Sequence, residues 1–213
     1  MCEKSNNKKS YFLFEIIFVI LLISYFSYSL LPKNTQPEFK VAIDRLVLYL
    51  NQTKLQAFID DKYDLSNPKW FRKRWTLKFF NCSENVGGIY YSIYSDTNMT
   101  GHPNADESLK DPLSKKYIYS SNSCEENNSN SEYVLLTKKF GIKNISMTCN
   151  STTSSIGQLS FGSDGKVYSR LSTEENDESS YLLNEDCIIN FISKKGDISG
   201  IKVHANTGFI EKL

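Results

Sequence analysis

Residues 8–34 are KKSYFLFEIIFVILLISYFSYSLLPKN, and this stretch decides how the chain is organised. The 21 residues from Tyr11 to Leu31 are predominantly apolar. At about 1.5 Å per residue, a helix of this length spans roughly 30 Å, the thickness of the hydrocarbon part of a bilayer. Lys4, Lys8 and Lys9 precede the run against the single acid Glu3. This bias predicts a cytoplasmic N-terminus with the rest of the chain on the far side of the membrane.

The apolar run contains one carboxylate, Glu15, and three interpretations of it are open. In the first, the segment is a plain signal anchor and the acid is tolerated near the interface. In the second, the segment is a cleaved secretory signal, because Ser27-Tyr28-Ser29 loosely matches the small-x-small cleavage pattern. In the third, the acid is retained for a partner, because an ionisable group inside a membrane costs a few kcal/mol.

The third interpretation is supported by a resemblance to type IV pilins and pseudopilins. The segment Lys9-Ser10 followed by YFLFEIIFVILLI (11–23) is similar to the signal that a membrane peptidase cuts before it methylates the new amine. A cut between Ser10 and Tyr11 places Glu15 at the fifth mature position and Pro32 at position 22, where pilin helices commonly carry a proline. Members of the family usually carry Gly before the cut, whereas this chain has Ser10.

The resemblance implies a role in assembly for Glu15. Cleavage leaves a charged amine on Tyr11, and the Glu15 carboxylate of one subunit can pair with the Tyr11 amine of its neighbour. One contact then offsets two desolvation costs. The family also implies a long N-terminal helix that lies half in the membrane and half against a sheet.

The segment after Pro32 and Pro37 predicts an amphipathic helix from Glu38 onward. Its apolar residues recur at helical spacing: Phe39, Ile43, Leu46, Leu50 and Ala57. We expect four segments: a cytoplasmic leader at 1–10, the transmembrane part of the helix at 11–31, a linker with the amphipathic helix at 32–64, and a β-rich periplasmic domain at 65–213.

Beyond Asp64, short strand patterns alternate with turn residues. The predicted strands are 75–80, 88–94, 117–120, 133–140, 144–149, 158–161, 166–171, 187–192, 200–205 and 208–212. Turns are predicted at 163–166, 195–197 and 206–208, where Gly supplies a positive φ, and surface loops at 95–116, 120–132 and 173–180. The fold class is therefore α+β, and the resemblance implies a pilin-like arrangement in which the N-terminal helix packs on an antiparallel sheet. The tail from Ile201 to Ile210 is loosely similar to the terminal strands of minor pseudopilins of type II secretion.

Cys82, Cys124, Cys149 and Cys187 lie on the predicted exported side, and Cys2 lies in the leader. An even number in an oxidising compartment indicates two disulfides, for which three pairings are possible. We favour Cys82–Cys124 and Cys149–Cys187, because each closes its own loop without crossing the other. A zinc site is the weaker alternative, since no two cysteines are close in sequence and there are only two histidines.

Six Asn-x-Ser/Thr sequons occur in the chain, at Asn51, Asn81, Asn98, Asn127, Asn144 and Asn150. Two of them carry an acid two residues earlier: DTNMT (96–100) and EENNS (125–129). This longer form resembles the acceptor of certain bacterial oligosaccharyltransferases, and both copies fall in predicted loops. Asn98 and Asn127 are therefore the candidate glycosylation sites.

One stretch, KWFRKRWTLK (69–78), places cations among aromatic residues. Such a strip can neutralise phosphates and stack on bases. The candidate nucleic-acid-binding residues are Lys69, Arg72, Lys73, Arg74, Trp75 and Lys78. The competing interpretation is a strand at the edge of a sheet, with aromatic residues inward and cations outward.

No enzymatic motif accompanies these features. The only histidines are His102 and His204, and no nucleophile turn or phosphate loop is present. We therefore expect no catalytic site, no cofactor and no metal site.

The sequence thus predicts a minor pseudopilin: a non-catalytic subunit of a periplasmic filament of the type II secretion or type IV pilus kind, anchored in a bacterial inner membrane. The expected partners are other pseudopilins, the prepilin peptidase and the inner-membrane assembly platform. The basic strip (69–78) adds DNA, as in DNA uptake during natural transformation (competence). The alternative is an unprocessed single-pass membrane glycoprotein that acts as a receptor or adhesin.

Overall fold

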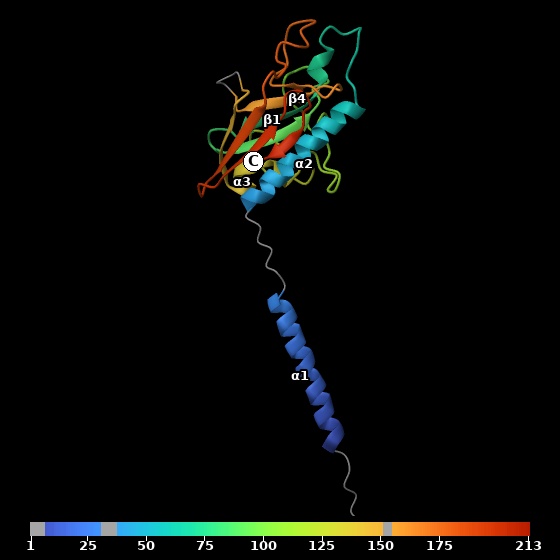
Figure 1. Ribbon diagram of the computed structural model, residues 1–213, viewed down its shortest axis with the longest axis vertical. Helices are drawn as coiled ribbons and strands as arrows, with labels where there is room; N and C mark the ends of the chain where they lie inside the picture. The colour runs from blue at the N-terminus through green and yellow to red at the C-terminus, as the bar shows by residue number, and fades with distance from the viewer. Residues whose placement is uncertain (1–6, 31–37, 151–154) are drawn as a thin grey trace, which may run out of the picture. The chain divides into compact units, whose positions relative to one another are not determined.

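The computed structural model describes residues 7–30, 38–150 and 155–213 (Figure 1). The chain divides into two compact units, Met1–Gln36 and Pro37–Leu213. The first contains helix α1 (Asn7–Leu30), in which the described side chains are those of residues 13–26. The predicted membrane segment, 11–31, extends at both ends beyond the residues whose side chains are described, 13–26.

The described side chains of α1 are exposed on every face of the helix. Among the apolar ones the exposed fraction ranges from 41% at Ile16 to 73% at Phe14. Within the described part of the chain, no helix combines the length and the apolar character that crossing a membrane requires.

The second unit is built around helix α2 (Glu38–Ile59), which confirms the predicted amphipathic helix. All five residues of the predicted apolar stripe are buried, and Ala42, Tyr49 and Thr53 are buried with them. The helix contacts β1, β4, β7 and β8, which belong to two different sheets (Figure 1). Burial of this one face therefore holds α2 against both sheets.

The first sheet is antiparallel, with strand order β2-β1-β4-β5. Its strands are β1 (Trp75–Asn81), β2 (Ile89–Tyr94), β4 (Gly157–Phe161) and β5 (Val167–Tyr168). Leu77 of the central strand pairs with Ile93 on one side and with Leu159 on the other. All three are 0% exposed, so the sheet's centre is part of the hydrophobic core.

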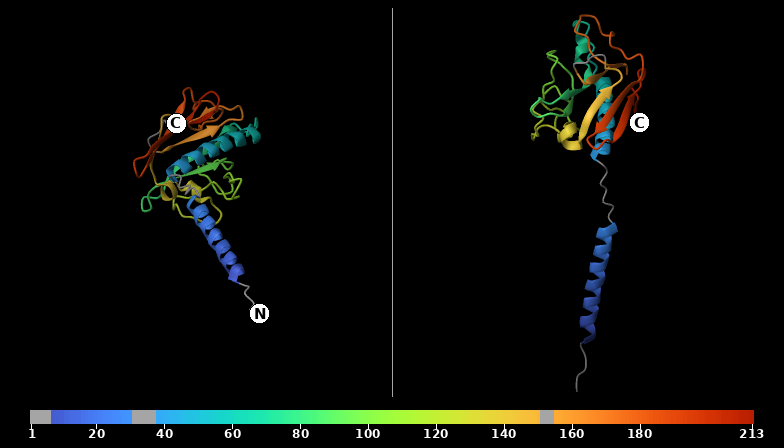
Figure 2. Two further views of the ribbon diagram at one scale, coloured as in Figure 1. Left: turned by 60° about the horizontal axis from the view of Figure 1, so that its bottom comes forward. Right: turned by 90° about the vertical axis from the view of Figure 1, so that its left-hand side faces the viewer.

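The second sheet is also antiparallel, with order β3-β6-β7-β8 (Figure 2). Its strands are β3 (Ile142–Met147), β6 (Cys187–Ser193), β7 (Ile198–Val203) and β8 (Ile210–Lys212). Strand β6 alternates buried and half-buried residues, the pattern of a sheet with one face on the core. The three predicted turns connect β4 to β5, β6 to β7 and β7 to β8, with positive φ at Gly165, Gly196 and Gly208.

Two predicted strands are wrong, and the expected sheet is two sheets. Residues 133–140 form a 3-10 turn, η2 (Glu132–Val134), and a short helix, α3 (Leu136–Phe140). Gly141 ends α3 in the left-handed conformation, with φ 65°. Residues 117–120 make only isolated bridges at Tyr117. At 133–140, tertiary contacts override the strand-like sequence pattern, because Leu136 and Phe140 are buried on one face of a helical turn.

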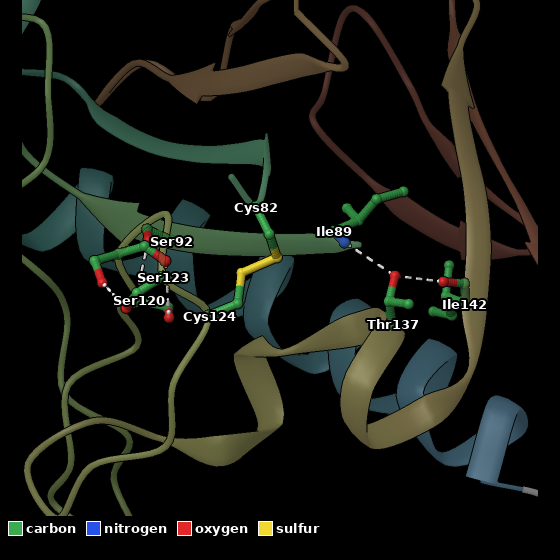
Figure 3. Close-up of a disulfide and its surroundings, with 9 residues drawn as sticks. Cys82, Ile89, Ser92, Ser120, Ser123, Cys124, Thr137 and Ile142 are labelled. Carbon is green, nitrogen blue, oxygen red and sulfur yellow. Dashed lines mark hydrogen bonds between the residues drawn. A yellow bond between two sulfur atoms is a disulfide. The ribbon is translucent and has the colours of Figure 1, made fainter. Parts of the chain in front are cut away.

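Thr137 of α3 joins the two sheets (Figure 3). Its hydroxyl accepts a hydrogen bond from the Ile89 N–H of β2 at 2.9 Å and donates to the Ile142 carbonyl of β3 at 2.6 Å. The close approach requires Gly88, where a Cβ would lie 2.9 Å from the Thr137 Cβ. One side chain thus satisfies a backbone donor and a backbone acceptor at the ends of two sheets.

Candidate functional site

The predicted processing and assembly residues lie at the N-terminal end of the chain. Ser10 and Tyr11 fall within α1, although their side chains are outside the described set. Pro32 lies outside the described residues altogether. Glu15 is described, and it is an exposed carboxylate on α1 among exposed apolar side chains. Exposed apolar side chains in this number are typical of a surface that lipid or another protein covers.

The basic strip does not present its cations on one face. Residues 70–73 form the 3-10 turn η1 (Trp70–Lys73), after which β1 begins at Trp75. Arg74 and Trp75 are only 7% and 8% exposed, so neither is available to a phosphate or a base. Lys78 is half-buried on β1, and burial lowers the pKa of its amine. The interpretation of the strip as a strand with its aromatic residues inward and its cations outward holds for Trp75 but not for Arg74.

The three remaining cations of the strip are partly exposed. Lys69 lies 3.7 Å from a carboxylate oxygen of Glu175. Arg72 donates to the Met99 carbonyl at 3.0 Å. Together with the half-buried Lys78, Lys69, Arg72 and Lys73 are therefore the part of the predicted nucleic-acid site that solvent reaches.

Arg74 lies inside the fold among aromatic rings. Its guanidinium carbon stands 3.9 Å from the centre of the Tyr168 ring and 4.9 Å from that of Trp70. One nitrogen donates to the Glu178 carbonyl at 2.8 Å, and the buried Nε has no hydrogen-bond partner among the described residues. Desolvation lowers the pKa of this cation. The arginine holds the 178–181 loop against the first sheet by stacking and one hydrogen bond.

A small cavity of about 140 Å³ adjoins Arg74 at the end of α2. Three aspartates line it, and two of them are paired: Asp60 with Lys62, and Asp164 with Lys166. Within the described part of the chain, no three His, Cys, Asp or Glu side chains are grouped in a way that could hold a metal ion. The cavity is therefore an ion-paired corner of the fold.

A groove of about 680 Å³ runs along the outer side of α2. Its rim carries exposed apolar residues, Leu48 and Leu55 of the helix and Leu113 of the 108–116 loop, with exposed fractions of 60%, 57% and 89%. Val41, Leu48 and Leu55 are seven residues apart on α2. This spacing is a signal that sequence reasoning missed: α2 has a second apolar stripe.

A polar cluster forms the floor of the groove and fixes the 108–116 loop to α2. The Tyr49 hydroxyl donates to Asp111 at 2.9 Å, and Arg45 donates to the Tyr49 oxygen at 3.2 Å. The Arg45 guanidinium also stacks 3.6 Å from the centre of the Tyr133 ring. Burial raises the pKa of Tyr49 to about 12, so its hydroxyl remains a donor at any physiological pH.

Both predicted disulfides are confirmed. Cys82 and Cys124 join the end of β1 to the 120–132 loop, with a Cα–Cα distance of 5.8 Å (Figure 3). Cys149 and Cys187 join the segment after β3 to the start of β6, at 5.2 Å. Disulfides persist in oxidising compartments, so the pairing favours a body that is folded outside the cytoplasm.

The two candidate glycosylation sites lie in loops, as expected, and both asparagines are exposed. Their surroundings differ, however. Asp96, the acid of the first sequon, is 6% exposed, whereas Glu125, the acid of the second, is exposed.

No protein-family model, curated protein or solved structure matches this chain.

Proposed function

We propose that this protein is a minor pseudopilin: a non-catalytic subunit of a filament that is assembled from an inner membrane. The observation that carries the proposal is the lone acid Glu15 in the apolar run 11–31, five residues after a Ser10–Tyr11 junction that follows two lysines. In this function residues 11–31 are the membrane anchor before assembly and part of the filament core after it.

Three features of the structure support the proposal. Helix α1 exposes its apolar side chains, which is tolerated only where lipid or other helices cover them. The second unit has an amphipathic helix at its start, packed on antiparallel sheets. Its two disulfides favour a folded body in the periplasm.

The mechanism is one of electrostatic register. After cleavage, the amine of Tyr11 is a cation in an apolar bundle, and the Glu15 carboxylate is an anion about one helical turn further along the same helix, where it can meet the Tyr11 amine of a neighbouring subunit. A subunit that enters with the two groups paired has no uncompensated charge, whereas one shifted along the bundle has two. This mechanism requires two partners, the prepilin peptidase and the inner-membrane assembly platform.

Two measurements test the proposal in the native host. N-terminal sequencing of the mature chain should begin at methylated Tyr11, and an intact Met1 would instead support the unprocessed membrane glycoprotein that acts as a receptor or adhesin. In the second, Glu15→Leu should leave the protein in the membrane but strongly reduce its recovery in sheared filaments. Glu15→Asp is the matched control, because it keeps the charge. Normal incorporation of Glu15→Leu would refute the pairing.

DNA as the cargo of the filament is a separate question, and it depends on Lys69, Arg72 and Lys73. Replacing all three by Ala should weaken DNA binding and reduce the slope of log K against log salt by about 2–3, roughly one unit for each lost phosphate contact. The control removes the same charge elsewhere, with Lys115, Lys143 and Lys195 changed to Ala, all of which are exposed. Equal slopes in the two triple variants would mean that the strip makes no specific contribution.

A further inference from the structure

The structure separates the six sequons by how firmly each one is held in the fold. Asn51 lies inside α2, Asn81 ends β1 opposite Ile89, and Asn144 lies in β3 opposite Ile192. Their backbones are fixed by helix or ladder hydrogen bonds, so these segments cannot leave the surface without local unfolding.

Asn150 is held through the amide that would accept a sugar. Its Nδ2 donates to the carbonyls of Ser155 and Ile156, at 2.7 and 3.1 Å. Transfer to this nitrogen would require both hydrogen bonds to break.

The sequon at 96–100 is closed by its own acid. The two carboxylate oxygens of Asp96 accept hydrogen bonds from the N–H groups of Thr100, at 3.1 Å, and Gly101, at 2.8 Å. Glu107 holds the turn from outside, because it accepts from the Thr97 hydroxyl and the Asn98 N–H, at 2.7 and 2.9 Å. An enzyme that must bind the acid and the asparagine together meets a buried carboxylate and a clamped turn.

The sequon at 125–129 has the opposite character. All five residues are exposed. The buried residues on either side of them, Cys124 and Ser131, are only 4% and 2% exposed. Residues 125–128 make no backbone–backbone hydrogen bond to any other described residue, and Glu125 has no ion-pair or hydrogen-bond partner there. The Asn127 Oδ1 accepts hydrogen bonds from the N–H groups of Ser129 and Asn130, at 2.9 and 2.8 Å, whereas its Nδ2, the atom that would accept the sugar, has no partner within the described residues. Glu126 pairs with Lys138 at 3.6 Å. The exposed run coincides with the acceptor sequence.

The flanks of this run are fixed. Cys124 is held by its disulfide to Cys82 (Figure 3). On the other side, the Tyr117 N–H donates to the Ser129 carbonyl at 2.9 Å, and the Ser131 N–H donates to the Tyr117 carbonyl at 2.8 Å. Once the two hydrogen bonds to the Asn127 Oδ1 open, the segment can therefore move into an enzyme while the body stays folded.

We propose that Asn127 is the N-glycosylation acceptor of the folded protein, and that Asn98 becomes an acceptor only when its turn opens. The proposal rests on export of the body, which the proposed function also requires, but it does not depend on filament assembly. N-terminal processing is measured separately, so the two can fail independently.

The reaction is the transfer of an oligosaccharide from a polyprenyl-diphosphate carrier. A bond forms between the Asn127 Nδ2 and the anomeric carbon, and the bond from that carbon to the phosphate oxygen breaks. The polyprenyl diphosphate leaves with the electron pair, and the amide nitrogen loses one proton to a base of the enzyme. No oxidant or reductant takes part.

The experiment uses the full chain, folded in detergent with both disulfides intact. It is incubated with a purified oligosaccharyltransferase that requires an acid two residues before the asparagine, and with a polyprenyl-diphosphate oligosaccharide. Intact mass and peptide mapping then give the occupancy of each site. Asn127 should be at least about tenfold more occupied than Asn98, because the closed turn must open before it reacts. In the reduced and alkylated chain, which we expect to be largely unfolded, the two occupancies should become similar.

Variants separate the acceptor sequence from the fold. Glu125→Gln should abolish most of the modification at Asn127, whereas the matched Glu126→Gln should not. Glu107→Ala loosens the 96–100 turn without changing the acceptor sequence, so it should raise occupancy at Asn98 and leave Asn127 unchanged. Equal occupancy of Asn98 and Asn127 in the folded chain, or a bare Asn127 while the alkylated chain is modified, would overturn the proposal. A bare Asn127 in both chains, with a peptide acceptor consumed by the same enzyme, would overturn it too.

Discussion

Arg74 is a cation buried inside the fold. Within the described part of the chain, no carboxylate oxygen lies within ion-pair distance of its guanidinium, and its Nε has no hydrogen-bond partner. What holds it is the stack on Tyr168, one hydrogen bond to the Glu178 carbonyl, and the packing of its long stem. We therefore expect packing to contribute more to stability than charge at this position.

Two substitutions at Arg74 separate packing from charge. Arg74→Ala removes the stem and the stack and should lower the free energy of unfolding by about 2–4 kcal/mol. Arg74→Met keeps most of the stem and removes an unpaired buried charge, so it should cost less than about 1 kcal/mol. Urea denaturation measures both, with the partly exposed Arg72→Ala as the control. If the Met variant is as unstable as the Ala variant, the charge interactions dominate and our expectation is wrong.

Asp111 makes stability depend on pH. Burial alone would raise the pKa of its carboxyl, but hydrogen bonds from the Leu113 N–H and the Tyr49 hydroxyl outweigh burial and hold the pKa below the ordinary value of 3.8. Because the folded-state pKa is the lower one, this stabilisation is complete above pH 3.8 and is lost as the pH falls through the folded-state pKa.

The difference in unfolding free energy between wild type and Asp111→Asn should therefore be about 1–3 kcal/mol at neutral pH and should shrink as the pH falls below about 4. Urea titrations at a series of pH values give this difference directly. The exposed Asp106→Asn is the control for general acid effects. A gap that stays constant down to the lowest pH would show that the Asp111 carboxylate does not carry the interaction.

At the scale of elements, Thr137 is one connection between the two sheets, beside α2, which packs on both. Thr137→Val keeps the shape but removes the hydroxyl, which leaves the Ile89 N–H and the Ile142 carbonyl without their partner. Each unsatisfied buried group costs about 1–3 kcal/mol, so the variant should lose about 2–4 kcal/mol of unfolding free energy. Thr137→Ser keeps the hydroxyl and should lose less than half as much. Similar losses in both variants would assign the effect to the methyl group instead.

The elements that sequence could predict are those whose pattern agrees with their burial. The stripe from Phe39 to Ala57 repeats at helical spacing because one face of α2 is covered, and the Gly165 turn follows from the need for positive φ. The strand predicted at 133–140 was wrong because the apolar residues there suit a strand as well as a short helix. Gly141 ends that helix in the left-handed conformation, and this is seen only in the folded chain. The prediction that Arg74 is an exposed cation was wrong because the strip does not alternate between inward and outward residues. Trp75, Thr76 and Leu77 at the start of β1 are all buried.

At the scale of the whole molecule, stability should depend on the compartment in which the body folds. The two disulfides close loops with sequence separations of 42 and 38 residues. In the chain-entropy account each contributes about 3–4 kcal/mol, which together is comparable to the total stability of a typical domain, about 5–15 kcal/mol. Reduction should therefore remove most of the unfolding free energy, and the protein made in a reducing cytoplasm should be largely unfolded or degraded.

The dependence of stability on the two disulfides distinguishes a body that folds after export from one that can fold in the cytoplasm before export. Urea midpoints of the oxidised and reduced chain measure it, and a variant with Cys82, Cys124, Cys149 and Cys187 changed to Ser controls for effects of the reductant. Removal of one pair at a time should give intermediate midpoints, because neither loop encloses the other. Equal midpoints for the oxidised and reduced chains would mean that the core alone stabilises the body, and the argument from disulfides to the periplasm would then lose its physical basis.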